Sequence, residues 1–332
     1  MQFEQVACDL CGGTEVDRVV AMRDPDNIAP GEFTVVMCKH CHLQYINPRP
    51  DKLSIGQCYP GNYYAFSSMQ KNVHASTLRK RIKRVIRSNK MLAAIAARLP
   101  ALRSAAIDLP FAADFDYWMP CGAILEVGCG SGGLLDIMRN NGWRTYGIEP
   151  SNDAAALAQA SGHQVFVMGG DDAYPDELSR LQFDLIYLSH SLEHMHYPTK
   201  SLSNLARLLK PVSGRMVIEV PNAESLLTYL FGELTPIYDV PRHLYFYSPD
   251  TLAAMLKKTG YRIESMRLFS RPNQFVRCFR AGIGRIPFEP WRLKADQVMG
   301  SAEFLAAMEP LSNYAERLKL GASIRVVVSR TD

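Results

Sequence analysis

The sequence predicts an α/β protein built on a doubly wound sheet, and three observations support this prediction. The length of 332 residues suits one large α/β domain with additions, or two domains. An apolar run at residues 123–127 leads directly into a cluster of glycines and becomes helical from Leu134. Residues 143–149 give a second expected strand, which ends in Glu149 and is followed by another helical pattern. Strand, tight glycine turn and helix form the first unit of a doubly wound sheet.

The overall composition is that of an ordinary globular protein. The chain has 47% hydrophobic and 21% charged residues, and its net charge of +4 is too small to indicate a nucleic-acid partner. No run of about eighteen uncharged apolar residues occurs, so no membrane span is expected. The N-terminal sequence MQFEQVACDLCGG lacks the charged-then-apolar pattern of a signal peptide. We therefore expect a cytoplasmic protein, whose eight cysteines indicate metal binding or buried thiols rather than disulfides.

Four of the cysteines form two pairs near the N-terminus. Cys8 and Cys11 form one C-x-x-C motif, Cys38 and Cys41 form a second, and 26 residues separate the two. Two such motifs together supply the four thiolates of a tetrahedral zinc site, with buried thiols or a redox pair as the alternative. Because four thiolates leave no open position, we expect a structural zinc that holds together a segment, residues 1–60, too small for a core of its own. The other cysteines lack paired spacing and are expected to be small apolar residues: Cys58, Cys121, Cys129 and Cys278.

Residues 61–119 are expected to form a basic helical linker. Residues 71–103 carry ten lysines and arginines and no acid, with apolar residues at helical spacing. This pattern fits either a solvated connecting helix or a surface that meets phosphates of a nucleotide-linked substrate, an anionic lipid or RNA. No aromatic residues are interleaved with the charges as base stacking requires, so we do not expect nucleic acid.

The glycine-rich turn predicts a binding site for a nucleoside-containing cofactor. Gly128, Gly130 and Gly132 let the backbone pass close to a ligand where a Cβ would collide with it. Glu149, 21 residues after Gly128, is placed to accept hydrogen bonds from ribose hydroxyls. Glu126 precedes the first glycine by two residues, so the order is E-x-G-x-G-x-G and differs from the dinucleotide pattern G-x-G-x-x-G.

This order resembles motif I of the class I S-adenosylmethionine-dependent methyltransferases. The paired C-x-x-C motifs, INPRP, LEHMHYP, VPN and DVPRHLYFYSPDTL together resemble a bacterial subgroup that carries an N-terminal zinc-binding segment. The resemblance covers residues 6–65 and 120–270. It implies a seven-stranded Rossmann-like sheet whose last strand, residues 322–330, is inserted antiparallel. The methyltransferase domain would then comprise residues 120–332, with an insert at about 271–320.

The resemblance also implies S-adenosylmethionine as the cofactor. In that family the acid at the position of Glu126 lies near the methionine part of the cofactor. Asp171, after the third strand, is a candidate for the adenine amino group or else part of a solvated loop. His190, closest to the end of the fourth strand, is expected to line the methionine pocket. The full expected set is Glu126, Gly128, Cys129, Gly130, Gly132, Glu149, Pro150, Asp171, Ser189 and His190.

Methyl transfer from a sulfonium is an in-line displacement, for which the enzyme must orient the acceptor and exclude water. A hydroxyl acceptor also needs a base. His243 is the first candidate for this base and His194 the second, because both follow strands that the resemblance places at the acceptor side. Glu193 is expected to cap or brace its loop, and His196 to lie at the surface. Two alternatives remain, namely a structural His243 bonded to backbone and a metal at His190 and His194.

We therefore expect an enzyme that methylates a small-molecule acceptor, at a hydroxyl of a sugar or glycan, a lipid or a secondary metabolite. A phosphate-bearing acceptor is among the candidates. The alternatives are an RNA or protein methyltransferase that docks through the zinc segment and the basic helix, and a binding protein without catalysis. The chain ends shortly after the last expected strand, so we do not expect the extra C-terminal domain of sugar C-methyltransferases or their particular activity. Peripheral membrane contact and the oligomeric state stay open.

Overall fold

A computed structural model of the chain describes residues 1–59, 122–284 and 289–331. The expected basic linker, residues 61–119, lies outside the described residues, as does Cys121. The chain divides into two compact units. The first comprises Met1–Pro60, Asp171–Leu181 and Leu188–Asp332, and the second comprises Gly61–Gly170 and Gln182–Tyr187.

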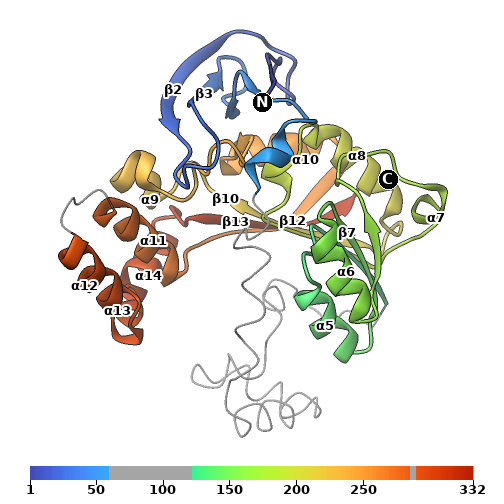
Figure 1. Cartoon of the computed structure of the whole chain (residues 1–332). Coiled ribbons are helices and arrows are strands. Elements are labelled where there is room, and N and C mark those ends of the chain that lie inside the picture. The colour runs from blue at the N-terminus through green and yellow to red at the C-terminus, as the bar shows by residue number, and fades with distance from the viewer. Residues whose placement is uncertain (60–121, 285–288, 332) are drawn as a thin grey trace, which may run out of the picture. The chain divides into compact units, whose positions relative to one another are not determined.

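A seven-stranded sheet has the strand order β12-β13-β10-β9-β6-β7-β8. Its strands β7, β10, β12 and β13 are labelled in Figure 1. Strands β6, β7 and β8 pair in parallel, whereas β13 pairs antiparallel with both β10 and β12. This arrangement confirms the predicted Rossmann-like sheet and its antiparallel last strand. The strands are β6 (Ala123–Val127), β7 (Arg144–Glu149), β8 (Gln164–Val167), β9 (Leu185–Ser189), β10 (Arg215–Pro221), β12 (Tyr261–Phe269) and β13 (Ser323–Arg330).

The second unit begins with the strand, turn and helix that the glycine pattern predicts. All five residues of β6 are buried, and the strand is followed by α5 (Gly133–Asn140), which packs against β7. Helix α6 (Asn152–Ala160) packs against β7 and β8 (Figure 1). It begins at Ser151, whose hydroxyl accepts a hydrogen bond from a backbone N–H of the first turn.

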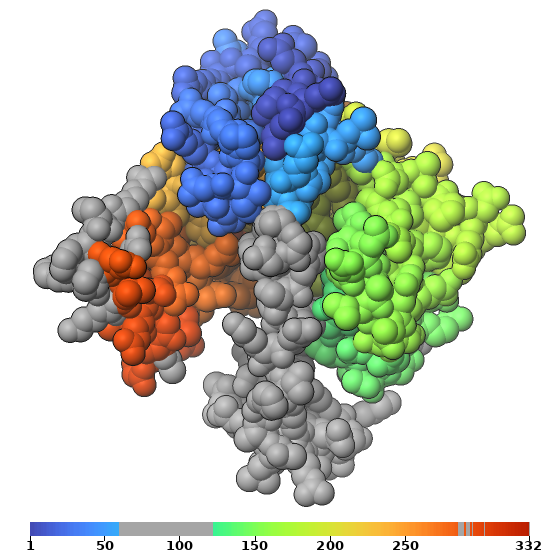
Figure 2. Space-filling view, viewed as in Figure 1, coloured from blue at the N-terminus to red at the C-terminus, as the bar shows by residue number. Residues whose placement is uncertain are grey.

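The N-terminal segment builds a four-stranded sheet in the order β11-β4-β3-β2. Three strands come from the segment itself, namely β2 (Val16–Arg23), β3 (Glu32–Cys38) and β4 (Gln44–Ile46). The fourth, β11 (Tyr245–Phe246), lies about 200 residues later and pairs antiparallel with β4. A buried cluster unites Phe33, Val35 and Ile46 with Val240 and Phe246, so the segment shares its core with a distant part of the chain. Figure 2 shows that the N-terminal residues, in blue, form one contiguous surface.

Further short elements complete the first unit. They are β1 (Phe3–Glu4), which pairs with β5 (Arg49–Pro50), and η1 (Ile55–Cys58), α7 (Asp176–Ser179), η4 (Leu192–His194), α8 (Pro198–Leu208), α9 (Leu226–Phe231), η5 (Gly232–Leu234) and α10 (Pro249–Lys258). Helix α10 begins with a reciprocal capping box between Ser248 and Thr251. None of the described helices is long and apolar enough to cross a membrane.

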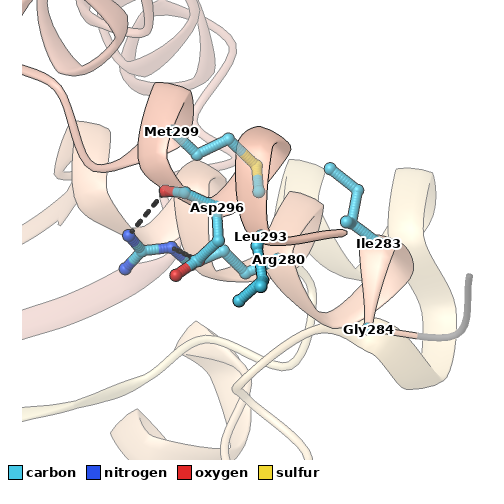
Figure 3. A pocket seen from close by; sticks show the side chains of 6 residues that line it. All are labelled: Arg280, Ile283, Gly284, Leu293, Asp296 and Met299. Atoms are coloured by element: carbon cyan, nitrogen blue, oxygen red, sulfur yellow. Dashed lines mark hydrogen bonds and ion pairs between the residues drawn. The ribbon is translucent and has the colours of Figure 1, made fainter. Parts of the chain in front are cut away.

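The insert between the last two strands of the sheet is helical. It contains α11 (Pro272–Ile283), α12 (Glu289–Met299), α13 (Ala302–Ala307) and α14 (Glu309–Arg317). Phe275 and Cys278 of α11 share a buried apolar cluster with Leu227 of α9 and Ala315 of α14. A small pocket between α11 and α12 contains the ion pair of Arg280 Nε with Asp296 Oδ1 at 2.8 Å (Figure 3). Its lining residues are Arg280, Ile283, Gly284, Leu293, Asp296 and Met299.

The turn after β6 allows a matched test of its glycines. Gly130 and Gly132 both have positive φ, but a Cβ at Gly132 would lie 2.8 Å from His163 Cδ2, whereas one at Gly130 would meet open space. We expect Gly130→Ala to lower the free energy of unfolding by about 1–2 kcal/mol through backbone strain alone. Gly132→Ala should cost about 1–3 kcal/mol more because of the clash. Urea unfolding without cofactor measures both, and equal losses would contradict the packing argument.

Candidate functional site

The four N-terminal cysteines meet at one point. Their Sγ atoms all lie within 4.8 Å of one another, and the Cys8–Cys41 and Cys11–Cys38 sulfur pairs are each 3.4 Å apart. In a tetrahedral site with Zn–S bonds of about 2.3 Å, neighbouring sulfurs lie about 3.8 Å apart. The spacing of the four sulfurs therefore suits a single ion of this kind.

The backbone at the two C-x-x-C motifs turns in the same way. Gly12 N donates to Cys8 O at 2.7 Å, and His42 N donates to Cys38 O at 2.9 Å. Both Gly12 and His42 have left-handed φ angles, 78° and 62°. The two motifs are thus equivalent tight turns that present their thiols from two directions, as a metal site requires.

The glycine turn of the second unit is held by Glu149. Its Oε2 accepts a hydrogen bond from Gly130 N at 2.8 Å, and its Oε1 accepts one from Ser151 N at 2.9 Å. Burial raises the pKa of Glu149, and these two backbone hydrogen bonds oppose the rise. The carboxylate predicted to receive ribose hydroxyls therefore also fixes the turn beside it.

Glu126 is a buried acid with an unsatisfied oxygen. Burial, and then the nearby charge of Glu149, raise its pKa well above the usual value and so favour its protonated form. Its Oε2 has no hydrogen-bond partner among the described residues. A buried polar atom of this kind fits contact with a bound polar ligand. With the open left-handed turn at Gly130, the residues present suit a nucleoside-bearing cofactor.

The other predicted cofactor residues have varied surroundings. Cys129 is buried and Pro150 exposed, and Ser189 ends β9. Gly128 and Gly132 have positive φ. In the first unit, the carboxylate of Asp171 accepts hydrogen bonds from Lys52 Nζ at 2.7 Å and from His196 N at 2.9 Å. Asp171 therefore braces the loop after β9, and its adenine role stays a prediction.

His190 sits between two buried carboxylates of the first unit. Its backbone has φ 51°, which is unusual for a residue with a side chain. The ring places Nδ1 3.3 Å from Glu193 Oε1 and Nε2 3.4 Å from Glu219 Oε1. Glu219 Oε1 also accepts from Arg271 at 2.8 Å, and its Oε2 accepts from Arg325 of the neighbouring strand at 2.7 Å.

The charges in this network support one another. Burial works against the charged His190 ring, but the hydrogen bonds to Glu193 and Glu219 outweigh it and raise its pKa to about 9. Burial also tends to raise the pKa of Glu219, yet His190 and Arg271 together hold it well below its usual value. His190 is therefore an imidazolium at neutral pH, and its side chain is 42% exposed.

The two candidate bases lie against each other. The rings of His194 and His243 have centroids 4.8 Å apart at an angle of 69°. His194 Nδ1 lies 2.9 Å from Arg242 O, and His243 Nδ1 lies 2.8 Å from Ile237 O. Because a carbonyl oxygen only accepts, each Nδ1 carries a hydrogen, and in the neutral form of either ring Nε2 is the nitrogen that can accept a proton. Burial, and then the charge of His243, lower the pKa of His194 to about 4, which keeps that ring neutral.

The loop after β9 does not place His190 and His194 on one helix. Only Leu192–His194 form a single 3-10 turn, so His190 and His194 do not share one helix face. Glu193, His194 and His243 instead bring one ligand-type atom each within 4.8 Å of one another. Glu193 is completely buried and its backbone oxygen accepts from Leu244 N, so it braces the loop as expected.

The prediction that His196 lies at the surface is wrong. Only 3% of the residue is exposed, and its Nε2 lies 3.1 Å from Pro50 O. The ring therefore packs against the N-terminal segment. By contrast, Cys58, Cys129 and Cys278 are buried, as expected for small apolar residues.

Several charged residues of the site were not found from the sequence. Glu219 and Arg325 lie in apolar strands, and each is buried as the cross-strand partner of the other. One acid in the first apolar strand and one base in the second could have indicated this ion pair, because buried charges need partners. Asp24 and Arg242 form a second buried pair, which no local pattern reveals.

Comparisons with known proteins identify a family and several relatives. A family model described as a methyltransferase domain matches residues 78–266. An O-methyltransferase of Aspergillus nomiae is 30% identical over 154 residues, 42% of this chain and 64% of that protein. A ubiquinone biosynthesis O-methyltransferase of Thiobacillus denitrificans is 31% identical over 158 residues, 43% of this chain and 66% of that protein. The chain thus spans just under two thirds of each of these relatives.

One solved structure illustrates the similarity in three dimensions. It is a SAM-dependent methyltransferase from Archaeoglobus fulgidus, which is 20% identical to this chain. The match has a TM-score of 0.44 and covers 66% of this chain and 90% of that one.

The pKa of His190 predicts how stability depends on pH. A ring whose pKa is raised by folding stabilises the fold fully below about pH 6.5, its unfolded value, and loses this contribution as pH rises through about 9. We compare the wild type with His190→Asn, since asparagine tolerates the left-handed backbone. The difference in melting temperature should be largest near pH 6 and should shrink by pH 10. A difference that stays constant over this range would contradict the charged state of His190.

Proposed function

The chain belongs to the methyltransferase domain family, and we propose that it transfers a methyl group from S-adenosylmethionine to a hydroxyl of a small molecule. The observation that carries the hydroxyl assignment is the hydrogen bond from His243 Nδ1 to Ile237 O, which leaves Nε2 as the proton-accepting atom. A neutral hydroxyl is a poor nucleophile, so a positioned base distinguishes this chemistry from transfer to an amine.

The residues that would hold the cofactor are Glu126, Gly128, Gly130 and Glu149. Two properties support them, the unpartnered Oε2 of Glu126 and the left-handed glycines. When bound, S-adenosylmethionine supplies a methyl group already activated by its sulfonium charge. The task of this chain is therefore to orient the acceptor and to exclude water, which together account for most of the rate of such displacements.

His243 is the proposed base. Its Nε2 takes the hydroxyl proton of the acceptor, and the imidazolium that forms lies 3.9 Å from Glu193 Oε1. Glu193 stays ionised because burial, which raises its pKa, is outweighed by the hydrogen bond and charge of His190. A buried carboxylate stabilises a cationic ring at this distance. His194, which is held neutral beside it, is the second candidate.

The names of the relatives support a small-molecule acceptor. They are O-methyltransferases of fungal origin and of ubiquinone biosynthesis. We propose a hydroxyl of a sugar or glycan, a lipid or a secondary metabolite as the target of this chain. The alternative of an RNA or protein substrate depended on the zinc segment and on the basic residues 71–103, and residues 71–103 lie outside the described part of the chain.

We further propose that Cys8, Cys11, Cys38 and Cys41 hold one structural zinc ion. The short distances between their sulfurs and the matching tight turns support this assignment. Burial raises the pKa of Cys41 to about 11, and a bound cation would favour the thiolate form of this ligand. The zinc would add folding energy to a segment that contributes only three strands of its own sheet.

The function is tested first by identifying an acceptor with methyl-labelled cofactor and a panel of phenols, sugar nucleotides and amines. With that acceptor, His243→Gln should lower kcat by about 10²–10⁴-fold. The dissociation constant of S-adenosylmethionine should not change. His194→Gln is measured in parallel, since the larger loss identifies the base. Wild-type turnover in His243→Gln would disprove the base assignment, and labelling of amines alone would disprove O-methylation.

The metal assignment predicts one zinc per chain by elemental analysis of the purified protein. Cys11→Ser should reduce the zinc content to a small fraction and lower the melting temperature, because one of four ligands is lost. Cys278→Ala, which removes a buried thiol far along the chain, is the matched control and should keep its zinc. Full zinc content in Cys11→Ser would exclude the four-cysteine site.

A further inference from the structure

We propose that Asp24 of the N-terminal segment is a positioning residue for His243 and His194, and that it acts through Arg242. This inference rests on the proposed function, because it assigns a role to residues around the candidate base. It gives the cysteine-bearing segment a part in catalysis in addition to stability. Four sets of contacts within the first unit support it.

The first set surrounds Arg242, a completely buried arginine. Its Nε lies 3.1 Å from both carboxylate oxygens of Asp239, three residues earlier. Its two terminal nitrogens donate to the two oxygens of Asp24, at 3.0 and 3.3 Å. Asp26 Oδ2, on a half-exposed side chain, lies 3.0 Å from the same guanidinium. The planar fork of arginine suits such two-sided binding.

The second set fixes Asp24 itself. Its carboxylate accepts backbone hydrogen bonds from Asp26 N at 2.9 Å, Ile28 N at 3.0 Å and Ala29 N at 2.8 Å. It follows directly on β2, and only 2% of the residue is exposed. Asp24 is therefore a preorganised anion whose position is set by the N-terminal segment before Arg242 binds to it.

The third set leads from Arg242 to the histidines. Arg242 O accepts the hydrogen bond from His194 Nδ1 at 2.9 Å. Asp239 O accepts from His243 N at 2.9 Å, and Ile237 O accepts from His243 Nδ1 at 2.8 Å. The backbone of one turn, residues 237–243, thus orients both rings, and the Arg242 side chain clamps that turn to Asp24.

The fourth set extends the clamp along the backbone. Leu244 N donates to Glu193 O at 2.8 Å, and Ile46 N donates to Leu244 O at 3.0 Å. The residues that follow His243 then form β11 and pair with β4. The segment therefore holds the turn on both sides of His243, by side-chain charge before it and by strand pairing after it.

The charge of Asp24 matters because Arg242 cannot lose its own. Removing a buried partner leaves a guanidinium that must find another anion or water. Asp239 is the remaining buried partner, and Asp26 is a poorer one, because burial raises its pKa. Asp24→Asn keeps the size of the side chain and one acceptor oxygen but weakens the clamp. A small displacement of a positioned base has a large effect on rate.

The test is a double-mutant cycle in the full-length protein with the identified acceptor. Asp24→Asn should lower kcat at least about tenfold, with the dissociation constant of S-adenosylmethionine and the zinc content unchanged. In a His243→Gln background the same change should have little further effect on kcat, since the base that it positions is absent. An equal loss in both backgrounds, or no loss in the wild-type background, would overturn the proposal.

Glu4→Gln is the matched control. Glu4 belongs to the same segment and pairs with a buried arginine, Arg49, at 2.8 Å, and this ion pair lies outside the described bonds that link Asp24 to the turn at 237–243. It should lower the melting temperature and leave kcat unchanged. If Asp24→Asn does not fold, the cycle is repeated with the half-exposed Asp26→Asn, where a smaller loss should again depend on His243. The cycle also separates the two proposals. A large loss of kcat in His243→Gln, followed by the same further loss when Asp24→Asn is added, rejects the role of Asp24 and not the base.

Discussion

The pairing of β4 with β11 is the constraint on which the candidate site depends. It fastens the N-terminal segment to a two-residue strand that begins two positions after His243. The turn before that strand carries Arg242, which binds both Asp239 and Asp24, and its carbonyls orient both His194 and His243. The segment with the four cysteines is therefore part of the framework of the candidate site. Loss of structure in this segment would also disorder the turn that carries His243.

The buried glutamates differ in pKa because their surroundings differ. In the second unit, Glu126 is buried with no cationic partner among the described residues, and burial favours its protonated form. In the first unit, Glu193 and Glu219 are equally buried but remain ionised, because His190 and Arg271 supply positive charge. Two types of carboxyl group thus arise from one residue type: a neutral acid suited to hydrogen bonding, and anions suited to stabilising a cationic ring.

Much of the fold could be predicted from local sequence, and less of the site. The apolar run of β6, the glycine turn and Glu149 are local features with a fixed period, and the structure has them as expected. The antiparallel β13 also agrees with the resemblance. Three features depend on contacts between residues more than 100 positions apart, which no local period in the sequence encodes. They are the ion pair of Glu219 with Arg325, the burial of His196 and the pairing of β11 with β4. The roles of the predicted cofactor residues stay predictions.

The discontinuity of the first unit has a consequence for how the chain folds. The N-terminal residues leave the ribosome first, but the last strand of their sheet and part of their core follow about 200 residues later. Until then the edge of β4 lacks its partner, and closing this loop carries an entropic cost that local contacts do not offset. Early capture of a metal ion by the four thiols would keep the nascent strands in register during that interval. The late-arriving strand then completes the sheet and the turn that carries His243.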